Sequence, residues 1–528
     1  MEKLSGRSLI GFREGIGAGE PIYATNPATG QRLQPAFISA TTEEVELAAR
    51  LSAEAFDSYR RVSGRKRGEF LRTIAAKIES IGADLIERAG LETALPPARL
   101  QAETLRTCAQ LRLFAEVAEE GSWVQARIDP GNPERQPAPK QDIRSMLRPL
   151  GPVVVFGASN FPLAFSVAGG DTASALAGGN TVIFKAHPAH PGTSELVGRA
   201  IQQSLRECNL PEGIFSLLFD AGTGVGTELV KHPLVKAGGF TGSRSAGRTL
   251  MDLAAARPEP IPFYAEMSST NPVFILPGAL HERGENIAAG LHASFTMGAG
   301  QFCTKPGLVF LPEAAEATAF SQKLQRLVAE SAPFHLLTKT IQSSYDQAIT
   351  ARKADASVVQ AALGKPGKAD AGFAAHVALF ETDADSFLSS GLGAEIFGPT
   401  TLLVQHSSRD RLLAIARALE GHLTATIHGT EEDLLHFADL IAILENKVGR
   451  IVFNGFPTGV EVTHAMVHGG PYPATSDGRS TSVGSQAIFR FARPVCYQGF
   501  PDSALPDALK NGNPLGIWRM VDGKMSRE

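Results

Sequence analysis

Residues 153–162 read Val-Val-Val-Phe-Gly-Ala-Ser-Asn-Phe-Pro, an apolar run that ends in a turn of small and polar residues. A run without polar alternation is typical of a strand buried on both faces of a parallel sheet. Similar runs follow at 181–184 and 215–219, and helix-length stretches at 165–177 and 194–207 separate them. The alternation predicts βαβ units with right-handed crossovers, in which ligands bind at the carboxyl ends of the strands.

A second alternation of strands and helices runs from residue 271 to 451. The pattern predicts strands at 273–276, 307–311, 401–405 and 449–453, and helices at 284–299, 315–330 and 408–420. The chain has 528 residues, which is more than one hydrophobic core usually serves. Two α/β domains, divided near residue 265, are therefore expected.

The segments around these alternations have other patterns. Thr41 and Glu44 have capping-box spacing and open the first of several expected helices. These helices are expected at 41–60, 64–80, 83–93 and 98–120. Residues 125–148 are rich in Pro, Gly and charge, with short alternating pieces at both ends, which predicts an extended hairpin outside the core. Residues 487–495 alternate apolar and polar side chains and predict an edge strand.

The composition is typical of a globular protein and argues against a nucleic-acid-binding or membrane protein. Hydrophobic residues make up 43% and charged residues 20% of the chain, as in ordinary globular proteins. The net charge is −4 without a broad basic face, so no nucleic-acid partner is expected. The start of the chain has no apolar signal segment, and no apolar stretch approaches the ~18 residues of a membrane span. The sequence therefore predicts a cytoplasmic protein without a membrane partner.

The cysteines are few and widely spaced. They are Cys108, Cys208, Cys303 and Cys496, and no CxxC pair occurs among them. This spacing predicts free thiols in a reducing compartment, with neither disulfides nor a metal site.

Three residues carry the candidate chemistry. Cys303 lies in a loop of small residues, where a thiol is accessible and backbone N–H groups can hold an oxyanion; the alternative is a buried structural cysteine. Glu266 follows an apolar–aromatic lead-in, where a carboxylate is expected to have a raised pKa and to deprotonate water; the alternative is a helix cap or an ion pair. Asn160 could donate its side-chain N–H to an oxyanion, or it could simply form the turn.

Gly-Gln-Phe-Cys at Cys303 and Phe-Tyr-Ala-Glu-Met-Ser at Glu266 resemble the nucleophile and general-base segments of aldehyde dehydrogenases. Phe-Thr-Gly-Ser-x-x-x-Gly at 240–247 and Glu-Ile-Phe-Gly-Pro at 395–399 resemble cofactor segments of the same family. The resemblance extends from about residue 26 to about residue 494. It implies that Cys303 attacks an aldehyde, that Asn160 and the Cys303 N–H stabilise the oxyanion, and that Glu266 activates the water that hydrolyses the thioester.

The resemblance also implies the architecture. An α/β fold is expected, with a Rossmann-type cofactor domain, an α/β catalytic domain and a small β oligomerisation arm. The implied boundaries are 1–125 and 149–265 for the cofactor domain, 266–485 for the catalytic domain, and 126–148 and 486–528 for the arm and tail. A homodimer or homotetramer is expected.

A nicotinamide cofactor is implied as well. The residues expected to bind it are Phe156, Lys185, His187, Pro188, Gly242, Ser243, Gly247, Glu395 and Phe397. Small residues at 242–247 let a helix N-terminus approach a pyrophosphate. The family has a ribose-binding glutamate where this chain has Pro188; because no acid there would repel a 2′-phosphate, NADP is expected over NAD, with NAD still possible.

The segments 455–462 and 468–475, together with 185–188, resemble 2-oxoglutarate semialdehyde (2,5-dioxopentanoate) dehydrogenases, and the rival resemblance is to NADP-dependent fatty aldehyde dehydrogenases. An anionic substrate requires a cation or several donors in its pocket. Arg479, His464 and His468 are candidates, although a surface arginine and structural histidines are the alternatives. A CoA-acylating reductase commonly lacks the glutamate, and an inactive scaffold protein would have lost Cys303 or Glu266; the chain has both residues.

Overall fold

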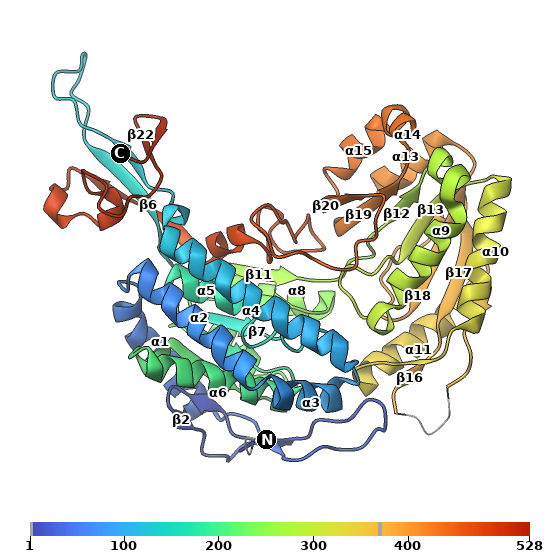
Figure 1. The fold of residues 1–528 in the computed structure, drawn as a ribbon, viewed down its shortest axis with the longest axis horizontal. Helices are drawn as coiled ribbons and strands as arrows, with labels where there is room; N and C mark the ends of the chain where they lie inside the picture. Colours follow the sequence, from blue (N-terminus) through green and yellow to red (C-terminus); the bar gives the residue numbers. More distant parts are fainter. Residues whose placement is uncertain (1–3, 368–371) are drawn as a thin grey trace.

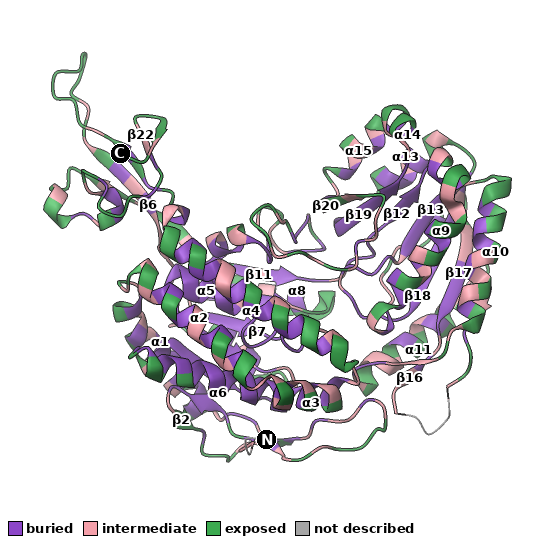
Figure 2. Cartoon of the chain, viewed as in Figure 1, coloured by how far each residue is buried: buried purple, intermediate pink, exposed green. Residues whose placement is uncertain are grey.

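The computed structural model describes residues 4–367 and 372–528. Two large sheets with helices on their faces form the body of the molecule, and a smaller sheet projects from it (Figure 1). The strand orders of the large sheets are β11-β10-β7-β8-β9-β1-β2 and β15-β17-β18-β13-β12-β19-β20. The strands of both are largely buried, and exposed residues lie mainly on the outer sides of the helices (Figure 2).

Parallel strands form the centre of the first sheet, as the apolar runs predict. They are β7 (Val153–Phe156), β8 (Val182–Lys185), β9 (Phe215–Leu218), β10 (Ala237–Thr241) and β11 (Phe263–Glu266). The short strands β1 (Leu9–Ile10) and β2 (Arg13–Glu14) extend one edge in antiparallel pairing. Val153 and Val155 belong to the core on one face, and Val154 and Phe156 to the core on the other, so β7 is buried on both faces.

Helices pack on both faces of this sheet. They are α1 (Thr42–Tyr59), α2 (Gly64–Ser80), α3 (Gly82–Thr93), α4 (Pro97–Glu120), α5 (Gly170–Gly178), α6 (Pro191–Glu207), α7 (Gly224–Lys231) and α8 (Arg244–Ala255). The predicted capping box is confirmed: the Thr41 hydroxyl accepts from the Glu44 N–H, and the Glu44 carboxylate accepts from the Thr41 N–H at 2.8 Å.

The second sheet contains the later strands. They are β12 (Val273–Ile275), β13 (Leu308–Pro312), β15 (Val359–Leu363), β17 (Ala378–Asp383), β18 (Thr400–His406), β19 (His422–His428) and β20 (Val448–Phe453). Among the described strands of this sheet, only the edge strand β15 pairs antiparallel. Its helices are α9 (Pro277–Thr296), α10 (Ala315–Glu330), α11 (Lys339–Ala354), α12 (Ala384–Ser389), α13 (Arg409–Ala418), α14 (Glu431–His436) and α15 (Ala438–Leu444).

The projecting sheet includes the predicted hairpin. Strands β5 (Arg127–Asp129) and β6 (Ile143–Pro149) pair antiparallel, with Arg127 opposite Ser145. The remaining strands of this sheet are β21 (Ala492–Gln498), β22 (Arg519–Val521) and β23 (Lys524–Ser526). Two further pairs are β3 (Pro21–Ile22) with β4 (Phe37–Ile38), and β14 (Phe334–His335) with β16 (Ala374–Ala375). The proposed domain boundaries stay a prediction.

Three predicted elements differ from the observed ones by about five residues or more at one end. Helix α5 begins at Gly170 rather than 165, because the N–H groups of Leu163 and Ala164 bind the Glu103 carboxylate and leave this segment as turns. Helix α9 begins at Pro277 rather than 284, with a break at Arg283, and ends at Thr296 rather than 299, where positive φ angles follow.

The third difference concerns the predicted edge strand. Residues 485–491 form a 3₁₀ helix instead, and only the segment from Ala492 onward is a strand. Ala487, Ile488 and Phe491 bury their side chains in the core of the first sheet, and an extended chain would not turn all three toward it.

A later segment of the chain returns from the second sheet to the first. Glu266 and Thr475 form an isolated antiparallel bridge, and the Met267 N–H donates to the Ala474 carbonyl at 2.7 Å. This return brings residues 468–482 beside the carboxyl end of β11. No helix in the described part of the chain is both long and apolar enough to cross a membrane.

Candidate active site

The loop that carries Cys303 has a strained start. Gly298, Ala299 and Gly300 have φ angles of 57°, 60° and 67°, which turn the chain sharply after α9. At Gly300 a Cβ atom would lie 2.2 Å from the Gly398 carbonyl oxygen. Only glycine fits at this position, because both the positive φ and the close approach exclude a side chain.

The buried side chains of Asn271 and Lys305 hold the same loop in place through hydrogen bonds to backbone carbonyls. The Asn271 side-chain amide donates to the carbonyls of Cys303, at 2.8 Å, and Lys305, at 2.9 Å. The Lys305 ammonium donates to the carbonyls of Ile396, at 2.8 Å, and Thr400, at 3.0 Å. Burial lowers the pKa of Lys305 to about 8. The loop is thereby tied both to the segment that precedes β12 and to the start of β18 with the residues before it.

Asn160 lies beside this loop, and its role as an oxyanion donor stays a prediction. Its side-chain amide donates to the Gln301 carbonyl at 2.9 Å, and it lines the same cavity as Cys303. One amide hydrogen is used in this bond, and an NH₂ group has a second.

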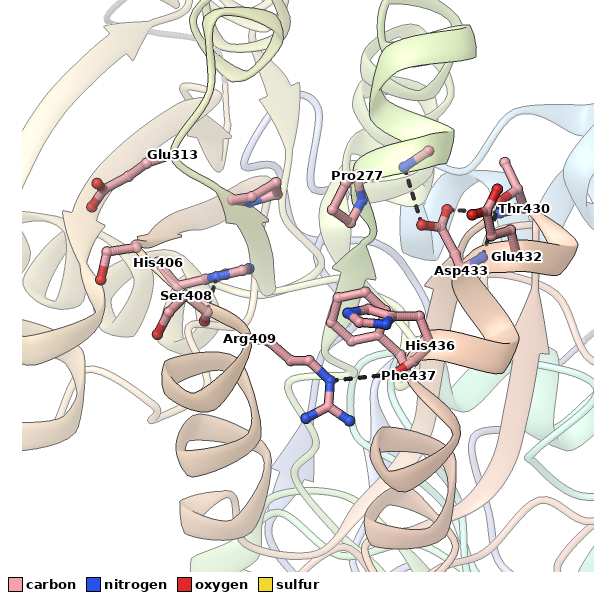
Figure 3. A pocket seen from close by; sticks show the side chains of 13 residues that line it. Pro277, Glu313, His406, Ser408, Arg409, Thr430, Glu432, Asp433, His436 and Phe437 are labelled. Carbon is pink, nitrogen blue, oxygen red and sulfur yellow. Dashed lines mark hydrogen bonds between the residues drawn. The ribbon is translucent and has the colours of Figure 1, made fainter.

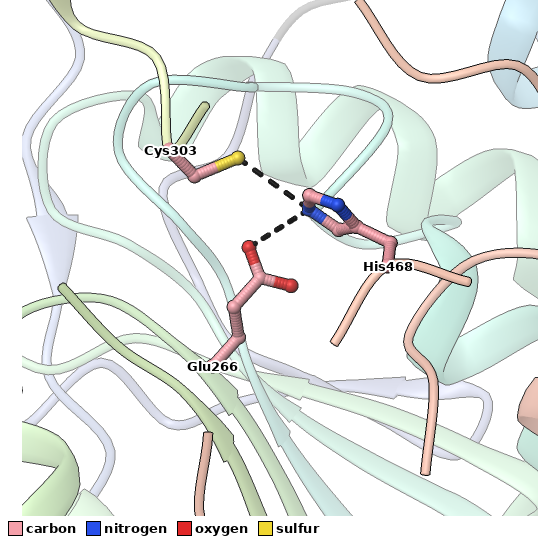
Figure 4. Close-up of side chains that lie close together, drawn as sticks. All are labelled: Glu266, Cys303 and His468. Carbon is pink, nitrogen blue, oxygen red and sulfur yellow. Dashed lines mark hydrogen bonds and ion pairs between the residues drawn. The ribbon is translucent and has the colours of Figure 1, made fainter. Parts of the chain in front are cut away.

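Three side chains that are distant in the sequence meet at the thiol. The Nε2 atom of His468 lies 3.5 Å from Cys303 Sγ and 3.0 Å from Glu266 Oε1 (Figure 4). The Ser482 hydroxyl donates to the other Glu266 oxygen at 2.8 Å. Because one imidazole nitrogen faces both groups, it can share a hydrogen with only one of them at a time.

Burial and charge set the protonation of this group. Burial raises the pKa of the Cys303 thiol well above its ordinary value, and the charge and hydrogen bond of Glu266 raise it further, against the opposing charge of Arg106. Burial also raises the pKa of Glu266, but the charge and hydrogen bond of His468, with hydrogen bonds from Ser482 and Cys303, outweigh it. The net pKa of Glu266 is lowered, so the expectation of a raised pKa is wrong.

Donor atoms of Glu266, Cys303 and His468 all lie within 4.8 Å of one another. This distance would also allow a metal ion. The sequence predicts no metal, and that stays a prediction.

Cys303 lies between two cavities. The first, of ≈ 540 Å³, is bounded mainly by α4 and by aromatic and apolar side chains. Its lining includes Phe161, Phe165, Phe302, Val460 and Val462, together with the charged residues Arg99, Glu103, Arg106 and Glu461. The second, of ≈ 500 Å³, extends from the N-terminus of α8 past Glu266 to the thiol. Cys303 therefore borders two cavities, one for each of two ligands.

Four of the predicted cofactor residues line the second cavity: Gly242, Ser243, Glu395 and Phe397. Ser243 caps α8, whose N-terminus carries the partial positive charge that suits a pyrophosphate. Burial raises the pKa of Glu395 to about 7 against the opposing charge of Lys305. A helix N-terminus, a buried carboxyl and an aromatic ring in one cavity suit the phosphate, ribose and nicotinamide parts of a dinucleotide.

The other five predicted cofactor residues do not line this cavity. Phe156 is buried against the ring of Phe240, and Gly247 faces Met267, where a Cβ atom would lie 2.7 Å from the side chain. Lys185, at the end of β8, has its ammonium 3.8 Å from Asp220 Oδ2. Next to it, the Nδ1 atom of His187 accepts from the Ala189 N–H, and Pro188 is half-buried. Their cofactor roles stay predictions.

Two candidate residues for an anionic substrate lie elsewhere. Arg479 is exposed and pairs with Asp477, and His464 lines a separate hollow beside Trp123. Of the three candidates only His468 reaches the thiol. Its contact with Cys303 could not be found from local sequence, because 165 residues separate the two positions.

A third hollow, of ≈ 570 Å³, lies in the second sheet's half of the molecule (Figure 3). Two of its polar side chains bind backbone groups of its own lining: His406 Nδ1 binds the Ser408 carbonyl, and Asp433 accepts from the N–H of Gly278. It contains none of the predicted site residues.

Asn271→Ala tests the anchoring of the loop. We expect the free energy of unfolding to fall by about 1–3 kcal/mol for each buried carbonyl left without a donor. We also expect iodoacetamide to alkylate Cys303 faster, because a loosened loop exposes the thiol. Urea unfolding and peptide mass spectrometry measure the two effects.

Asn180→Ala is the matched control. Asn180 is also fully buried and binds the backbone of Gly151 and Ala175, but it lies before β8, away from the thiol. This variant should lose stability without changing the alkylation of Cys303. Equal alkylation rates in both variants and the wild type would contradict the anchoring role of Asn271.

Known proteins resemble this chain over its full length. A model of the aldehyde dehydrogenase family matches residues 16–472. Alpha-ketoglutaric semialdehyde dehydrogenase 2 of Azospirillum brasilense is 48% identical over 524 residues, 99% of each chain. Alpha-ketoglutaric semialdehyde dehydrogenase of Acinetobacter baylyi is 45% identical over 532 residues, 100% of each chain.

A solved structure shares the fold. Betaine aldehyde dehydrogenase from Staphylococcus aureus, in complex with NAD⁺, has a TM-score of 0.81 at 19% identity, covering 95% of this chain and 96% of its own. The expected α/β fold, with its Rossmann-like part, is confirmed. The chain belongs to the aldehyde dehydrogenase family and is an oxidoreductase that acts on aldehydes.

Proposed function

We propose that this enzyme oxidises alpha-ketoglutaric semialdehyde (2,5-dioxopentanoate) to 2-oxoglutarate with NADP as the hydride acceptor. The observation that carries the proposal is the position of Cys303, whose thiol lines both an aldehyde-sized cavity and the cavity that suits a dinucleotide. The names of two full-length relatives support the choice of aldehyde.

The first step needs a thiolate. Burial raises the pKa of Cys303 well above its ordinary value, so the thiolate requires a hydrogen-bond donor beside it. His468 Nε2 lies 3.5 Å from the sulfur and is in position to stabilise the thiolate. The thiolate sulfur bonds to the aldehyde carbon, and Asn160 with the Cys303 N–H hold the oxyanion that results.

The second step needs a base. A dinucleotide held by Gly242, Ser243, Glu395 and Phe397 would supply the hydride acceptor for the oxidation of the thiohemiacetal carbon to a thioester on Cys303. Glu266 then takes a proton from water, whose oxygen attacks the thioester carbon and releases the carboxylate and the thiol. A lowered pKa keeps Glu266 ionised at neutral pH, and Ser482 and His468 hold its two oxygens.

NADP preference is the finer part of the proposal. Lys185 and His187 adjoin Pro188 at the end of β8, and the absence of an acid at 188 leaves room for a 2′-phosphate. Asp220, which lies 3.8 Å from Lys185, already accepts from the N–H groups of Gly222 and Gly226. Its charge is therefore partly compensated.

Assembly into a homodimer or homotetramer is also proposed. A small sheet and the tail beside it project from the body of the molecule (Figure 1), and they expose large apolar side chains to solvent. These are Ile143, Phe500, Leu515, Trp518 and Met525. Apolar groups on a projection favour contact with another copy of the chain.

Pro188→Glu tests the cofactor assignment. A carboxylate at this position should repel the 2′-phosphate and lower kcat/KM for NADP at least about tenfold, or ~1.4 kcal/mol, with kcat/KM for NAD unchanged or raised. Pro188→Gln has the same size without the charge and should leave the NADP preference in place. A wild type that prefers NAD, or equal losses with both cofactors, would overturn the assignment.

The substrate is tested by steady-state kinetics with the wild type. We expect kcat/KM for alpha-ketoglutaric semialdehyde to exceed that for dodecanal at least about tenfold, or ~1.4 kcal/mol of transition-state discrimination. Fluorescence of the reduced cofactor follows both reactions. A preference for dodecanal would reject the semialdehyde and favour the rival fatty aldehyde activity.

A further inference from the structure

One cation in the wall of the first cavity is left without a hydrogen-bonding partner for most of its donors. Arg106 lies on α4, and its Nε atom donates to the Val460 carbonyl at 3.2 Å. Its Nη1 and Nη2 atoms are buried and have no hydrogen-bond partner within residues 4–367 and 372–528. A buried donor without a partner costs free energy, and a charged one costs more.

The neighbouring charged side chains on α4, Arg99 and Glu103, already bind other groups. Arg99 donates to Glu103 Oε2 at 2.6 Å, and its guanidinium lies over the ring of Phe161 at 4.6 Å. The other Glu103 oxygen accepts from the N–H groups of Leu163 and Ala164. Both Glu103 oxygens therefore already accept from other groups, and none of these bonds comes from Arg106, although Arg106 lies one helical turn away.

The surroundings of Arg106 strengthen any ion pair that it forms. Its guanidinium carbon lies 5.2 Å from the centre of the Phe165 ring, and this ring lies 5.9 Å from that of His468. Burial lowers the pKa of Arg106, opposed by the charges of Glu103, Cys303 and Glu266; an arginine nonetheless stays protonated. Aromatic walls exclude water and lower the local dielectric.

We propose that the Nη1 and Nη2 groups of Arg106 bind the carboxylate of the substrate, and that Arg106 selects aldehydes that carry a carboxylate a few carbons from the aldehyde group. The proposal rests on the proposed function and names its specificity residue. Two parallel N–H donors match the two oxygens of a carboxylate. A neutral aldehyde would leave the buried guanidinium of Arg106 unpaired, which costs free energy. The enzyme would therefore select against neutral aldehydes through this cost and for carboxylates through the hydrogen bonds that they accept.

Arg106→Met tests the proposal by kinetics. We expect its kcat/KM for alpha-ketoglutaric semialdehyde to fall about 10- to 100-fold, the range for hydrogen bonds to a charged group, mainly through KM. Its kcat/KM for pentanal, which has the same chain length without the charge, should be unchanged or higher. Arg106→Lys keeps a point charge and should recover part of the loss.

Arg112→Met is the matched control. It removes a cation from the same helix, but one that Glu79 already pairs and that lies outside the cavity lining. It should therefore change kcat/KM for the two aldehydes by the same factor. If Arg106→Met also changes kcat/KM for the semialdehyde and for pentanal by the same factor, the proposal is overturned.

A second readout does not depend on the substrate. Iodoacetate is an anionic reagent and iodoacetamide a neutral one, so the ratio of their alkylation rates at Cys303 reports an anion site beside the thiol. Cys496 is exposed and serves as the internal reference. This ratio, relative to that at Cys496, should fall in Arg106→Met, and an unchanged ratio would overturn the anion site.

Different results would reject the proposed function and the proposed role of Arg106. If the wild type prefers pentanal or dodecanal to the semialdehyde, the proposed function fails, whereas the alkylation ratio still decides for or against an anion site at Arg106. If the wild type prefers the semialdehyde and Arg106→Met keeps both that preference and the alkylation ratio, the role of Arg106 is wrong and the proposed function stands.

Discussion

One imidazole nitrogen contacts both reactive groups of this enzyme. His468 Nε2 faces the thiol of Cys303 and the carboxylate of Glu266, and the rest of the site depends on keeping the three together. Glu266 ends a strand of the first sheet, and Cys303 precedes a strand of the second. His468 comes from the segment that returns to the first sheet after the second is complete. The bridge between Glu266 and Thr475 fixes this return beside the carboxylate.

Buried charge is the second constraint on the site. Lys305 is almost fully buried, yet its ammonium binds two carbonyls and offsets the charge of Glu395. Burying an ammonium group without partners costs free energy. Removing the partners of Lys305 would therefore destabilise the fold more than replacing Lys305 by an apolar residue of similar size. Arg106 differs, because its outer nitrogens lack partners in the described residues. A substrate carboxylate would supply hydrogen-bond acceptors for these nitrogens. Substrates with a carboxylate would therefore bind better than neutral aldehydes.

The sequence predicts the local features well. Buried strands such as 153–156 and helices such as 64–80 and 315–330 agree with the structure, because apolar periodicity and caps act over a few residues. Failures come where tertiary contacts override the local pattern. The segment 487–491 alternates like a strand, yet it forms a 3₁₀ helix since the core takes its apolar side chains.

The site is predictable only in part. Cys303, Glu266 and Asn160 are identified by motif, and the structure brings all three to one cavity. The contact of His468 with them joins positions 165 and 202 residues apart, and no local pattern reveals it. The wrong expectation for the pKa of Glu266 has the same origin, because His468 supplies the charge that lowers it. The burial of Lys305 and the free donors of Arg106 likewise depend on distant segments.

The most direct test of the account is a search for the covalent intermediate at Cys303. Glu266→Gln, mixed with NADP and alpha-ketoglutaric semialdehyde and quenched in acid, should carry an acyl group from the substrate on the peptide that contains Cys303, because thioester formation continues while hydrolysis slows. Peptide mass spectrometry locates the group. An unmodified Cys303 in a variant that still reduces NADP, or an acyl group on Cys496 instead, would contradict the central role of the thiol between the two cavities.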